Sequence, residues 1–380
     1  MVNIEYTAKK TIQSKQRADT SLLITILVLV VFGLIMMFSA SHVNAWVLMG
    51  DSFYYIKKQI IYAVVGLIFM IVISHIDYHI LHRFAWPLVI ASQIMLIITL
   101  FMPPISGAKR WIIVGSSFTF QPSELAKFAI ICLIAHIASI KPAKMKEFKY
   151  GFLQPMAIMI GFSAVMLFQT HLSGMILILL VGLILMFISG TKMRYFFLAA
   201  GVVVPAGLAF VMLTDKMAYA ATRIQMWLNP FADSSSDGYQ TIQSLLAIGS
   251  GGLMGLGLGN SRQKHLYVPE PQNDFIFSII CEELGFIGAV FVVVLFLIFI
   301  FRGFSIALNA KDKFGAIMAI GITAQIGLQA MLNIAVVSNT IPNTGISLPF
   351  FSAGGSSLVL LLMEVGVLLS VSRYSATRAA

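Results

Sequence analysis

The chain has 380 residues, of which 59% are hydrophobic and only 11% are charged, and its mean hydropathy is +0.92. Soluble domains carry roughly 25% charged residues. The composition therefore excludes an ordinary soluble protein and indicates helices that span a bilayer. The net charge of +10 does not indicate a nucleic-acid surface, because the basic residues lie in short connections between apolar runs, where they control membrane topology.

Ten apolar runs along the chain predict ten membrane-spanning helices. A polar break at 169–173 separates the fifth run from the sixth, because together they would form a span of about 38 residues where a bilayer needs roughly 20. Residues 1–380 are therefore predicted to form a single all-α polytopic membrane domain, which includes a polar N-terminal tail at 1–20. The predicted spans are 21–41, 59–76, 84–102, 123–140, 152–169, 173–190, 195–214, 274–300, 314–337 and 348–371.

The distribution of Lys and Arg predicts the orientation of these spans. With the N-terminus inside, 16 basic residues lie in inner connections and 8 in outer ones, so both termini are expected in the cytoplasm. The longest connection, 215–273 between the seventh and eighth spans, is then extracytoplasmic. It is moderately apolar and nearly charge-balanced, which favours a folded cap over disorder. Topology does not explain the outer basic residues, which are Lys57, Lys58, Lys109, Arg110, Lys216, Arg223, Arg262 and Lys264.

Asp274 opens the eighth predicted span, in the sequence PEPQNDFIFS. One interpretation is a helix N-cap, since Asp accepts hydrogen bonds from the free amides at helix starts. The other is a carboxylate at the mouth of a cavity, which accepts a proton from a hydroxyl nucleophile. A helix N-terminus would hold the carboxylate ionised, whereas apolar surroundings would raise its pKa, so both interpretations stay open.

Apart from Glu124 at the start of the fourth span, three glutamates fall within predicted spans, where ionisable groups are costly and usually face the protein interior or a water-filled path. Glu282 and Glu283 lie about two helical turns beyond Asp274. They form either a structural pair with a basic neighbour or part of such a path. Glu364 in the last span allows the same two interpretations.

A second polar group combines Arg110 with Glu124 and Lys127. The latter two are three residues apart, so they share a helix face and can pair. A lysine that enters the bilayer also suits an anionic ligand such as a pyrophosphate. Arg110 would help to bind such a ligand, together with Arg262 and Lys264 from the long connection.

Polar and turn-forming residues gather between 333 and 357, in NIAVVSNTIPNTGISLPFFSAGGSS. Irregular backbone near membrane depth survives only where it lines a cavity or is buried in protein. The small residues at 353–357 also permit close helix packing. The concentration of hydroxyl and amide side chains favours the cavity.

Five motifs occur in order along nearly the whole chain. They are GAKRWI at 107–112, QPSELAK at 121–127, GYQTIQSLLAIGSGGLMGLGLG at 238–259, PExxxDFIFSIICEELGFIG at 269–288 and NTGISLPFFSAGGSS at 343–357. Together they resemble the SEDS family (shape, elongation, division and sporulation). The segment LGNSRQKHLYVPE at 258–270 is more similar to the FtsW and SpoVE branch than to the RodA branch.

The resemblance implies a peptidoglycan glycosyltransferase that polymerises lipid II at the outer face of a bacterial cytoplasmic membrane, by inverting transfer onto a sugar hydroxyl. Asp274 matches the essential aspartate of the family. A divalent cation, Mg²⁺ or Mn²⁺, is a candidate cofactor with no assigned ligands. The implied partners are a class B penicillin-binding protein transpeptidase and other division proteins. The expected substrate-binding residues are Arg110, Glu124, Lys127, Gln263, Lys264, Glu282, Glu283, Asn343, Ser356 and Ser357.

The chain departs from the family pattern at two places. His171 and Ser173 stand in HLSG, where many members have Asp-Leu-Gly-Thr, so a role for that aspartate cannot be transferred. PEPQND replaces the common PExHTD, which leaves Asp274 in place and changes its neighbours.

Two other functions remain compatible with the sequence. A transporter that flips lipid II would also use intramembrane charges and broken segments, although we find no inverted repeat and the polar motifs gather at one face. A scaffold that recruits division proteins would tolerate substitutions of the polar cavity residues. Division, sporulation and elongation are not distinguished by physical arguments.

Overall fold

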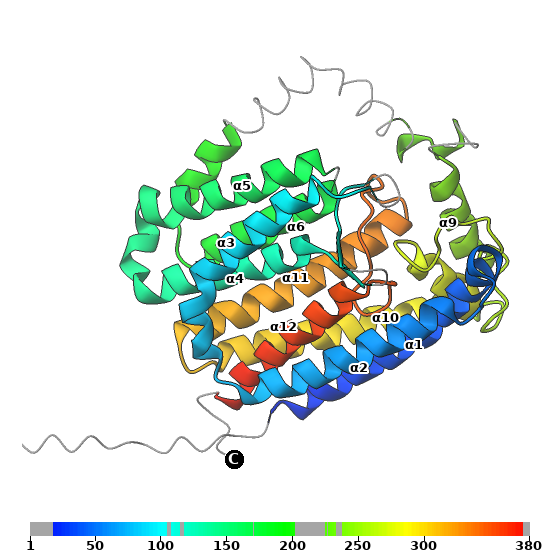
Figure 1. Cartoon of the computed structure of the whole chain (residues 1–380), viewed down its shortest axis with the longest axis horizontal. Helices are drawn as coiled ribbons and strands as arrows, with labels where there is room; N and C mark the ends of the chain where they lie inside the picture. Colours follow the sequence, from blue (N-terminus) through cyan, green and yellow to red (C-terminus); the bar gives the residue numbers. More distant parts are fainter. Residues whose placement is uncertain are drawn as a thin grey trace, which may run out of the picture.

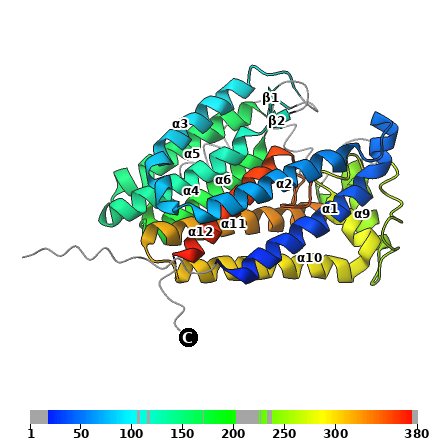
Figure 2. The same ribbon diagram turned by 60° about the horizontal axis from the view of Figure 1, so that its bottom comes forward.

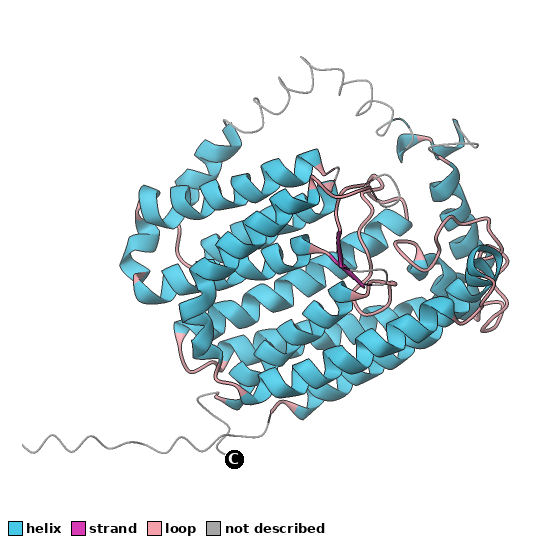
Figure 3. Cartoon of the chain, viewed as in Figure 1, coloured by secondary structure: helices cyan, strands magenta, loops and turns pink. Residues whose placement is uncertain are grey.

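The computed structural model describes residues 18–104, 108–114, 118–169, 171–201, 225, 227–232 and 238–374. Within these ranges the chain is almost entirely helical, which confirms the all-α prediction (Figure 3). The only strands described there are β1 (Ile112–Val114) and β2 (Phe118–Phe120), which pair antiparallel with Ile112 opposite Phe120. This short hairpin was not predicted.

In the described part of the chain, eight helical segments are long and apolar enough to cross a membrane, and two of them (Tyr78–Thr99 and Phe148–Phe168) include a short helical turn before the α-helix. Leu172–Ile188 is a shorter apolar helix. These nine correspond to nine of the ten predicted spans. Of the seventh span, 195–214, only residues 195–201 are described, and they are helical. The nine are α1 (Thr20–Met49), α2 (Tyr54–His75), α3 (Leu81–Thr99), α4 (Pro122–Ile140), α5 (Gln154–Phe168), α6 (Leu172–Ile188), α10 (Ile276–Leu308), α11 (Lys313–Val337) and α12 (Ser356–Arg373).

Shorter elements connect these helices. The 3₁₀ turn η1 (Tyr78–Ile80) precedes α3, and η2 (Pro142–Lys146) with the π-helical η3 (Phe148–Leu153) leads into α5. In the long connection before α10, the described elements are the turn η4 (Pro230–Ala232) and the helix α9 (Tyr239–Ser250).

The helices run back and forth between two ends of the bundle, and the two ends of the described chain meet at one of them (Figure 1). Asp19 caps α1 by accepting a hydrogen bond from the Leu22 amide at 2.9 Å. Its carboxylate also pairs with Arg302 near the end of α10, and its amide donates to Ser372 Oγ at 3.1 Å. We call this the terminal end of the bundle.

Helices α4, α11 and α12 form the interior of the bundle, whereas α2 and α3 lie at its periphery. In the most apolar part of α12, 72% of the residues are buried, against 22% in α2 and in α3. Figure 2 shows α12 between α2 and α11, with which it is in contact. The exposed apolar side chains of α2 and α3 are those expected to face lipid.

The segment between α11 and α12 is irregular, and α12 begins at Ser356 rather than at the predicted residue 348. A Cβ atom on Gly33 would collide with the carbonyl of Phe350, so this segment packs directly on α1. Gly33 lies 13 residues after Thr20, which is about 20 Å along a helix. Irregular backbone thus lies at membrane depth, as the sequence predicted, and is buried in protein there.

The Gly-rich stretch after α9 packs on the first turns of α10, backbone against backbone. The amides of Leu256 and Gly257 donate to the carbonyls of Glu282 and Glu283, both at 2.9 Å. Gly285, with φ of +66°, kinks α10 at this contact. The glycines therefore permit a close approach of two chain segments.

Candidate active site

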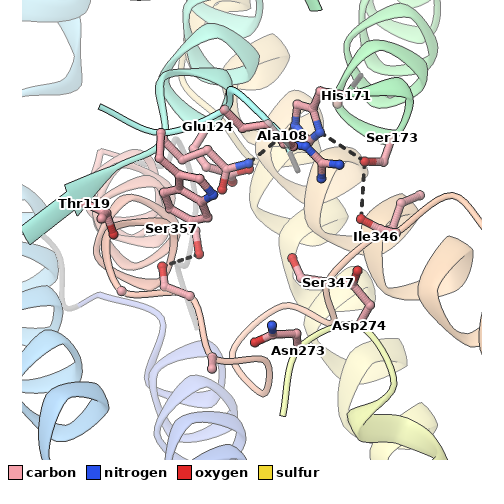
Figure 4. Close-up of a pocket in the computed structure, with 18 of the residues that line it drawn as sticks. Ala108, Thr119, Glu124, His171, Ser173, Asn273, Asp274, Ile346, Ser347 and Ser357 are labelled. Carbon is pink, nitrogen blue, oxygen red and sulfur yellow. Dashed lines mark hydrogen bonds between the residues drawn. The ribbon is translucent and has the colours of Figure 1, made fainter. Parts of the chain in front are cut away.

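A cavity of about 620 Å³ opens at the start of α12, opposite the terminal end of the bundle, and Figure 4 shows side chains that line it. Six helices or their flanking segments and the β1–β2 hairpin contribute to it. The lining residues are Tyr55, Lys58, Gln59 and Tyr62; Ala108, Arg110, Trp111, Ile113, Thr119 and Gln121; Glu124 and Lys127; His171, Ser173, Gly174 and Leu177; Glu270, Asn273 and Asp274; Gln329; and Gly345, Ile346, Ser347, Ala353, Gly354, Gly355 and Ser357.

Asp274 lies in this pocket beside Ser347, just before the start of α10 (Figure 4). The N-cap residue of α10 is Phe275, so the N-cap interpretation of Asp274 is wrong. The backbone of Asp274 is instead fixed by Asn333 of α11, whose Nδ2 donates to the Asp274 carbonyl at 2.7 Å. This bond does not involve the side-chain carboxylate of Asp274, which is available to the pocket.

The electrostatic surroundings suit Asp274 for proton transfer. Burial raises the pKa of Asp274 to about 6, against an opposing effect of the Arg110 guanidinium and with a small further rise from Glu270. A general base works best when its pKa lies near the operating pH. At neutral pH the carboxylate is mostly ionised and still basic.

Three basic side chains line the same pocket. Burial lowers the pKa of Arg110, and the charge of Asp274 opposes this change. Lys127 Nζ lies 2.8 Å from Glu124 Oε2 and donates to Gln329 Oε1 at 3.0 Å. The predicted Glu124–Lys127 pair therefore exists, and both of its members line the cavity. The third basic residue, Lys58, donates to the hydroxyl of Tyr54 at 2.7 Å.

Three site residues were predicted between 343 and 357, and they have different positions. Ser357 lines the pocket and donates to the Gly354 carbonyl at 2.6 Å. Ser356 and Asn343 do not line it. Ser356 Oγ accepts the amide of Gln121 at 3.2 Å, and Asn343 Oδ1 accepts that of Gly345 at 3.1 Å, so both hold pocket walls in place.

The structure does not bring Gln263, Lys264, Glu282 and Glu283 to the pocket. Lys264 Nζ pairs with Glu283 Oε1 at 2.9 Å, and both side chains are fully buried. Glu283 also accepts a hydrogen bond from a serine of α1, Ser39 Oγ, at 2.6 Å. These contacts join the long connection to α10 and α1.

Glu282 is part of the same buried network. It accepts hydrogen bonds from the amides of Arg262 and Gln263, at 2.9 and 3.3 Å, and from the hydroxyl of Ser261. Of the two interpretations of this glutamate pair, the structural one fits the described contacts. Glu364 likewise accepts from Gln325 Nε2 at 2.8 Å, in the interior between α11 and α12.

Sequence reasoning left several lining residues unassigned. Lys58 belongs to the outer basic residues that topology did not explain, which was a usable signal. Gln329 lies four residues before Asn333 on one face of α11, a polar spacing that also could have been noticed. His171 was recognised only as a departure from a motif. Trp111 and Glu270 are fixed letters of the motifs GAKRWI and PExxxD, which was a signal that could have been used.

His171 is a buried residue of the pocket wall. Burial lowers its pKa to about 3, and the charges of Arg110 and Lys127 contribute in the same direction. The imidazole is therefore neutral at physiological pH.

The fold and this pocket define a polytopic helical membrane protein with a charged, recessed cavity at one end of its bundle. The chain belongs to the FTSW_RODA_SPOVE family, described as cell cycle proteins, whose model matches residues 19–377. This confirms the resemblance seen in the five motifs.

Named relatives match nearly full length. A probable peptidoglycan glycosyltransferase FtsW of Geobacter sp. (strain M18) is 41% identical over 93% of this chain and 96% of its own length. The stage V sporulation protein E of Bacillus subtilis (strain 168) is also 41% identical, over 95% of this chain and 98% of its own.

Solved structures share the fold. A chain of a peptidoglycan synthase complex, described as coordinating polymerization and crosslinking, aligns with a TM-score of 0.77 and 25% identity over 94% of this chain and 98% of its own. The rod shape determining protein RodA of Thermus thermophilus aligns with a TM-score of 0.69 and 24% identity, over 95% and 98% of the two chains.

Proposed function

We propose that this chain is a peptidoglycan glycosyltransferase that polymerises lipid II, with Asp274 as its general base. The activity is supported by the relatives named for it, which match the chain almost from end to end. The observation that carries the assignment of the base is the position of Asp274. It is an aspartate with a pKa of about 6, inside a pocket that three basic residues also line.

The chemistry needs one proton acceptor and one stabilised leaving group. The acceptor sugar hydroxyl attacks the anomeric carbon of the donor and gives its proton to the Asp274 carboxylate. A new carbon–oxygen bond forms with inversion as the bond from the anomeric carbon to the pyrophosphate oxygen breaks. A positioned base typically contributes about 10²–10⁴-fold to such a step.

The departing pyrophosphate acquires negative charge, which Arg110, Lys127 and Lys58 are placed to stabilise. Lys264, which the sequence included in this set, lies in the buried network with Glu283 instead. Lys58 takes its place in the proposal. An arginine offers a planar pair of donors to phosphate, whereas each lysine acts as a point charge.

A divalent cation remains part of the proposal. Among the described residues no cluster of three or more His, Cys, Asp and Glu side chains could hold a metal ion alone. Asp274 and Glu270 line the same pocket, however, and Mg²⁺ is commonly held by one or two carboxylates together with substrate phosphates. When bound, it would neutralise pyrophosphate charge. Polymerisation should then fall with EDTA and return with Mg²⁺ or Mn²⁺; activity that is indifferent to chelation would remove the cation from the proposal.

The pocket end is proposed to face the outside of the cytoplasmic membrane, with both termini in the cytoplasm. The bias of Lys and Arg toward the inner connections supports this orientation. In the described part of the chain, the polar lining gathers at one end of the bundle, whereas a flippase needs a site reachable from both sides. This favours polymerisation over transport of lipid II.

The proposed partner is a class B penicillin-binding protein, a single-pass transpeptidase. It is supported by the solved complex with a similar fold, which is described as coordinating polymerization with crosslinking. A polymerisation assay with and without a cognate transpeptidase tests this. The relatives named as FtsW and as a stage V sporulation protein are equally identical to the chain, so division and sporulation both remain in the proposal.

The test of the assignment is Asp274→Asn, assayed as purified protein on lipid II with glycan products resolved on a gel. Polymer formation should fall by about 10²-fold or more while the protein folds. The matched control is Asp51→Asn, because Asp51 lies near the start of α2, pairs with Lys57 at 2.8 Å and does not line the pocket. Normal strands from the Asp274 variant would refute its role as base.

A further inference from the structure

His171 occupies a place in the pocket that the proposed chemistry does not use. It precedes α6, and its ring lies over Gly174, where a Cβ atom would be 2.5 Å from Nε2. The glycine therefore leaves the space that the imidazole fills. The two ring nitrogens face different parts of the pocket wall.

The Nε2 side of the ring faces the start of α4. Nε2 lies 3.4 Å from Gln121 Nε2 and 3.1 Å from Ser123 Oγ. A side-chain amide nitrogen only donates, so the imidazole accepts at Nε2. A neutral ring that accepts at Nε2 carries its proton at Nδ1. The low pKa of His171, caused by burial and by Arg110 and Lys127, agrees with a neutral ring.

The Nδ1 side of the ring leads to the irregular segment. Nδ1 lies 3.4 Å from Ser173 Oγ, and Ser173 Oγ donates to the Gly345 carbonyl at 3.3 Å (Figure 4). With the proton on Nδ1, every group donates in one direction, from Gln121 and Ser123 through His171 and Ser173 to Gly345. Each link then joins a donor to an acceptor, with Gln121 and Ser123 sharing the single lone pair of Nε2.

Gly345 is the residue that this chain reaches, and it lies against Asp274. A Cβ atom on Gly345 would be 3.2 Å from Asp274 Oδ2. The neighbouring Ile346 carbonyl accepts from Asn333 Nδ2 at 2.6 Å. The segment beside the carboxylate is thus held from two sides. Asn333 of α11 binds it on one side, and on the other side it is bound by the hydrogen bonds that run from His171 through Ser173, which we call the His171 relay.

We propose that His171 is a positioning residue whose neutral imidazole, through Ser173, fixes Gly345 against the carboxylate of Asp274. The inference rests on the proposed function and explains how this chain uses histidine in HLSG. Breaking the relay releases the Gly345 carbonyl and admits water beside Asp274. The carboxylate then loses part of its burial and becomes a weaker base in a less fixed position.

Two substitutions of similar polarity separate this role from simple space filling. His171→Asn can place an amide donor where Nδ1–H was and keep the bond to Ser173. His171→Gln reaches the Nε2 position, near Ser123, and loses that bond. Ser173→Ala removes the next link. The charged groups that face this pocket are unchanged in all three variants: Lys58, Arg110, Glu124, Lys127 and Glu270.

The measurement is the pH profile of lipid II polymerisation together with kcat and KM. His171→Gln and Ser173→Ala should lower kcat about ten-fold, leave KM nearly unchanged and move the acidic limb from near pH 6 toward lower pH. His171→Asn should keep the wild-type limb. Their double variant, His171→Gln with Ser173→Ala, should be no worse than either single one.

Two outcomes would overturn the inference. One is a variant His171→Gln that retains more activity than His171→Asn, since glutamine better fills the space of the ring. The other is an acidic limb that does not move. The proposed function fails separately, if Asp274→Asn still polymerises lipid II in the same assay.

Discussion

Gly345 packs against the carboxylate of Asp274, so that a Cβ atom at residue 345 would lie 3.2 Å from Oδ2. Gly345 also has φ of +68°, a conformation that residues with a side chain rarely adopt. A glycine here meets two needs at once, a left-handed backbone and a close approach to the proposed base. The two needs can be separated by experiment.

Gly345→Ala should reduce polymerisation by about 10- to 100-fold, because the added methyl group displaces either Asp274 or the segment that holds it. The backbone strain alone costs about 1 kcal/mol. Gly50→Ala is the matched control, since Gly50 has φ of +71° and nothing within 4 Å of its added Cβ. Thermal stability should fall alike in both variants and activity in Gly345→Ala only. Equal activities would show that the contact with Asp274 does not matter.

The raised pKa of Asp274 also predicts how stability depends on pH. Its pKa is 3.8 ordinarily and about 6 in the folded protein, because of burial. The folded state therefore binds more protons between these values, and stability falls as the pH rises from about 4 to 6. Above pH 6 the ionised carboxylate destabilises the fold by up to about 3 kcal/mol.

Asp274→Asn should accordingly be more stable than the wild type at pH 7.5, and the difference should vanish near pH 4. Thermal unfolding in detergent at both pH values measures this. If the variant were less stable than the wild type at pH 7.5, the interactions of the Asp274 carboxylate with its neighbours, and not its burial, would determine its contribution to stability.

Two adjacent lysines provide an internal comparison for the pyrophosphate site. Lys58 lines the pocket, whereas Lys57 is 66% exposed and pairs with Asp51. Lys58→Met should reduce polymerisation by about 10-fold or more, the loss of one charge-assisted contact of roughly 1.5–3 kcal/mol. Lys57→Met should have little effect, because exposed pairs contribute at most about 1 kcal/mol. Similar losses in the two variants would refute the placement of pyrophosphate beside Lys58.

The buried pair of Lys264 and Glu283 should affect folding more than chemistry. Removing one partner of a buried pair costs about 3–5 kcal/mol, because the other charge is left without compensation. Lys264→Met should therefore lower thermal stability strongly, and Lys264→Met with Glu283→Gln should recover part of it. If Lys264→Met were fully stable and inactive, the residue would bind substrate, as the sequence motif suggested.

The sequence predicted most of the fold because apolar runs of spanning length leave few alternatives. Helix ends were less predictable. The first helix continues to Met49, past the predicted end at 41, because the polar residues Ser41, His42 and Asn44 are compatible with a helix that has left the hydrocarbon. The last helix begins later than its hydropathy suggests, since the apolar Leu348, Phe350 and Phe351 are buried within an irregular segment.

Part of the site was also predicted from the sequence. Asp274, Arg110, Glu124, Lys127 and Ser357 line one pocket, as their shared polarity near one face indicated. Polarity alone does not distinguish a ligand site from a buried ion pair, because both use lysine and glutamate. The network of Lys264 and Glu283 was therefore indistinguishable from a binding site until its partners were known.

The residues around Phe350 reach α1 roughly halfway along its length, at Gly33. The cavity itself reaches Gln329, eight residues before the end of α11, which is about 12 Å along a helix, so its floor lies below the helix ends. Under the proposed function, two lipid-linked sugars could meet there while their tails stay dissolved among the surrounding lipids. Only the glycan product, which carries no lipid tail along its length, would need to leave the cavity toward the wall.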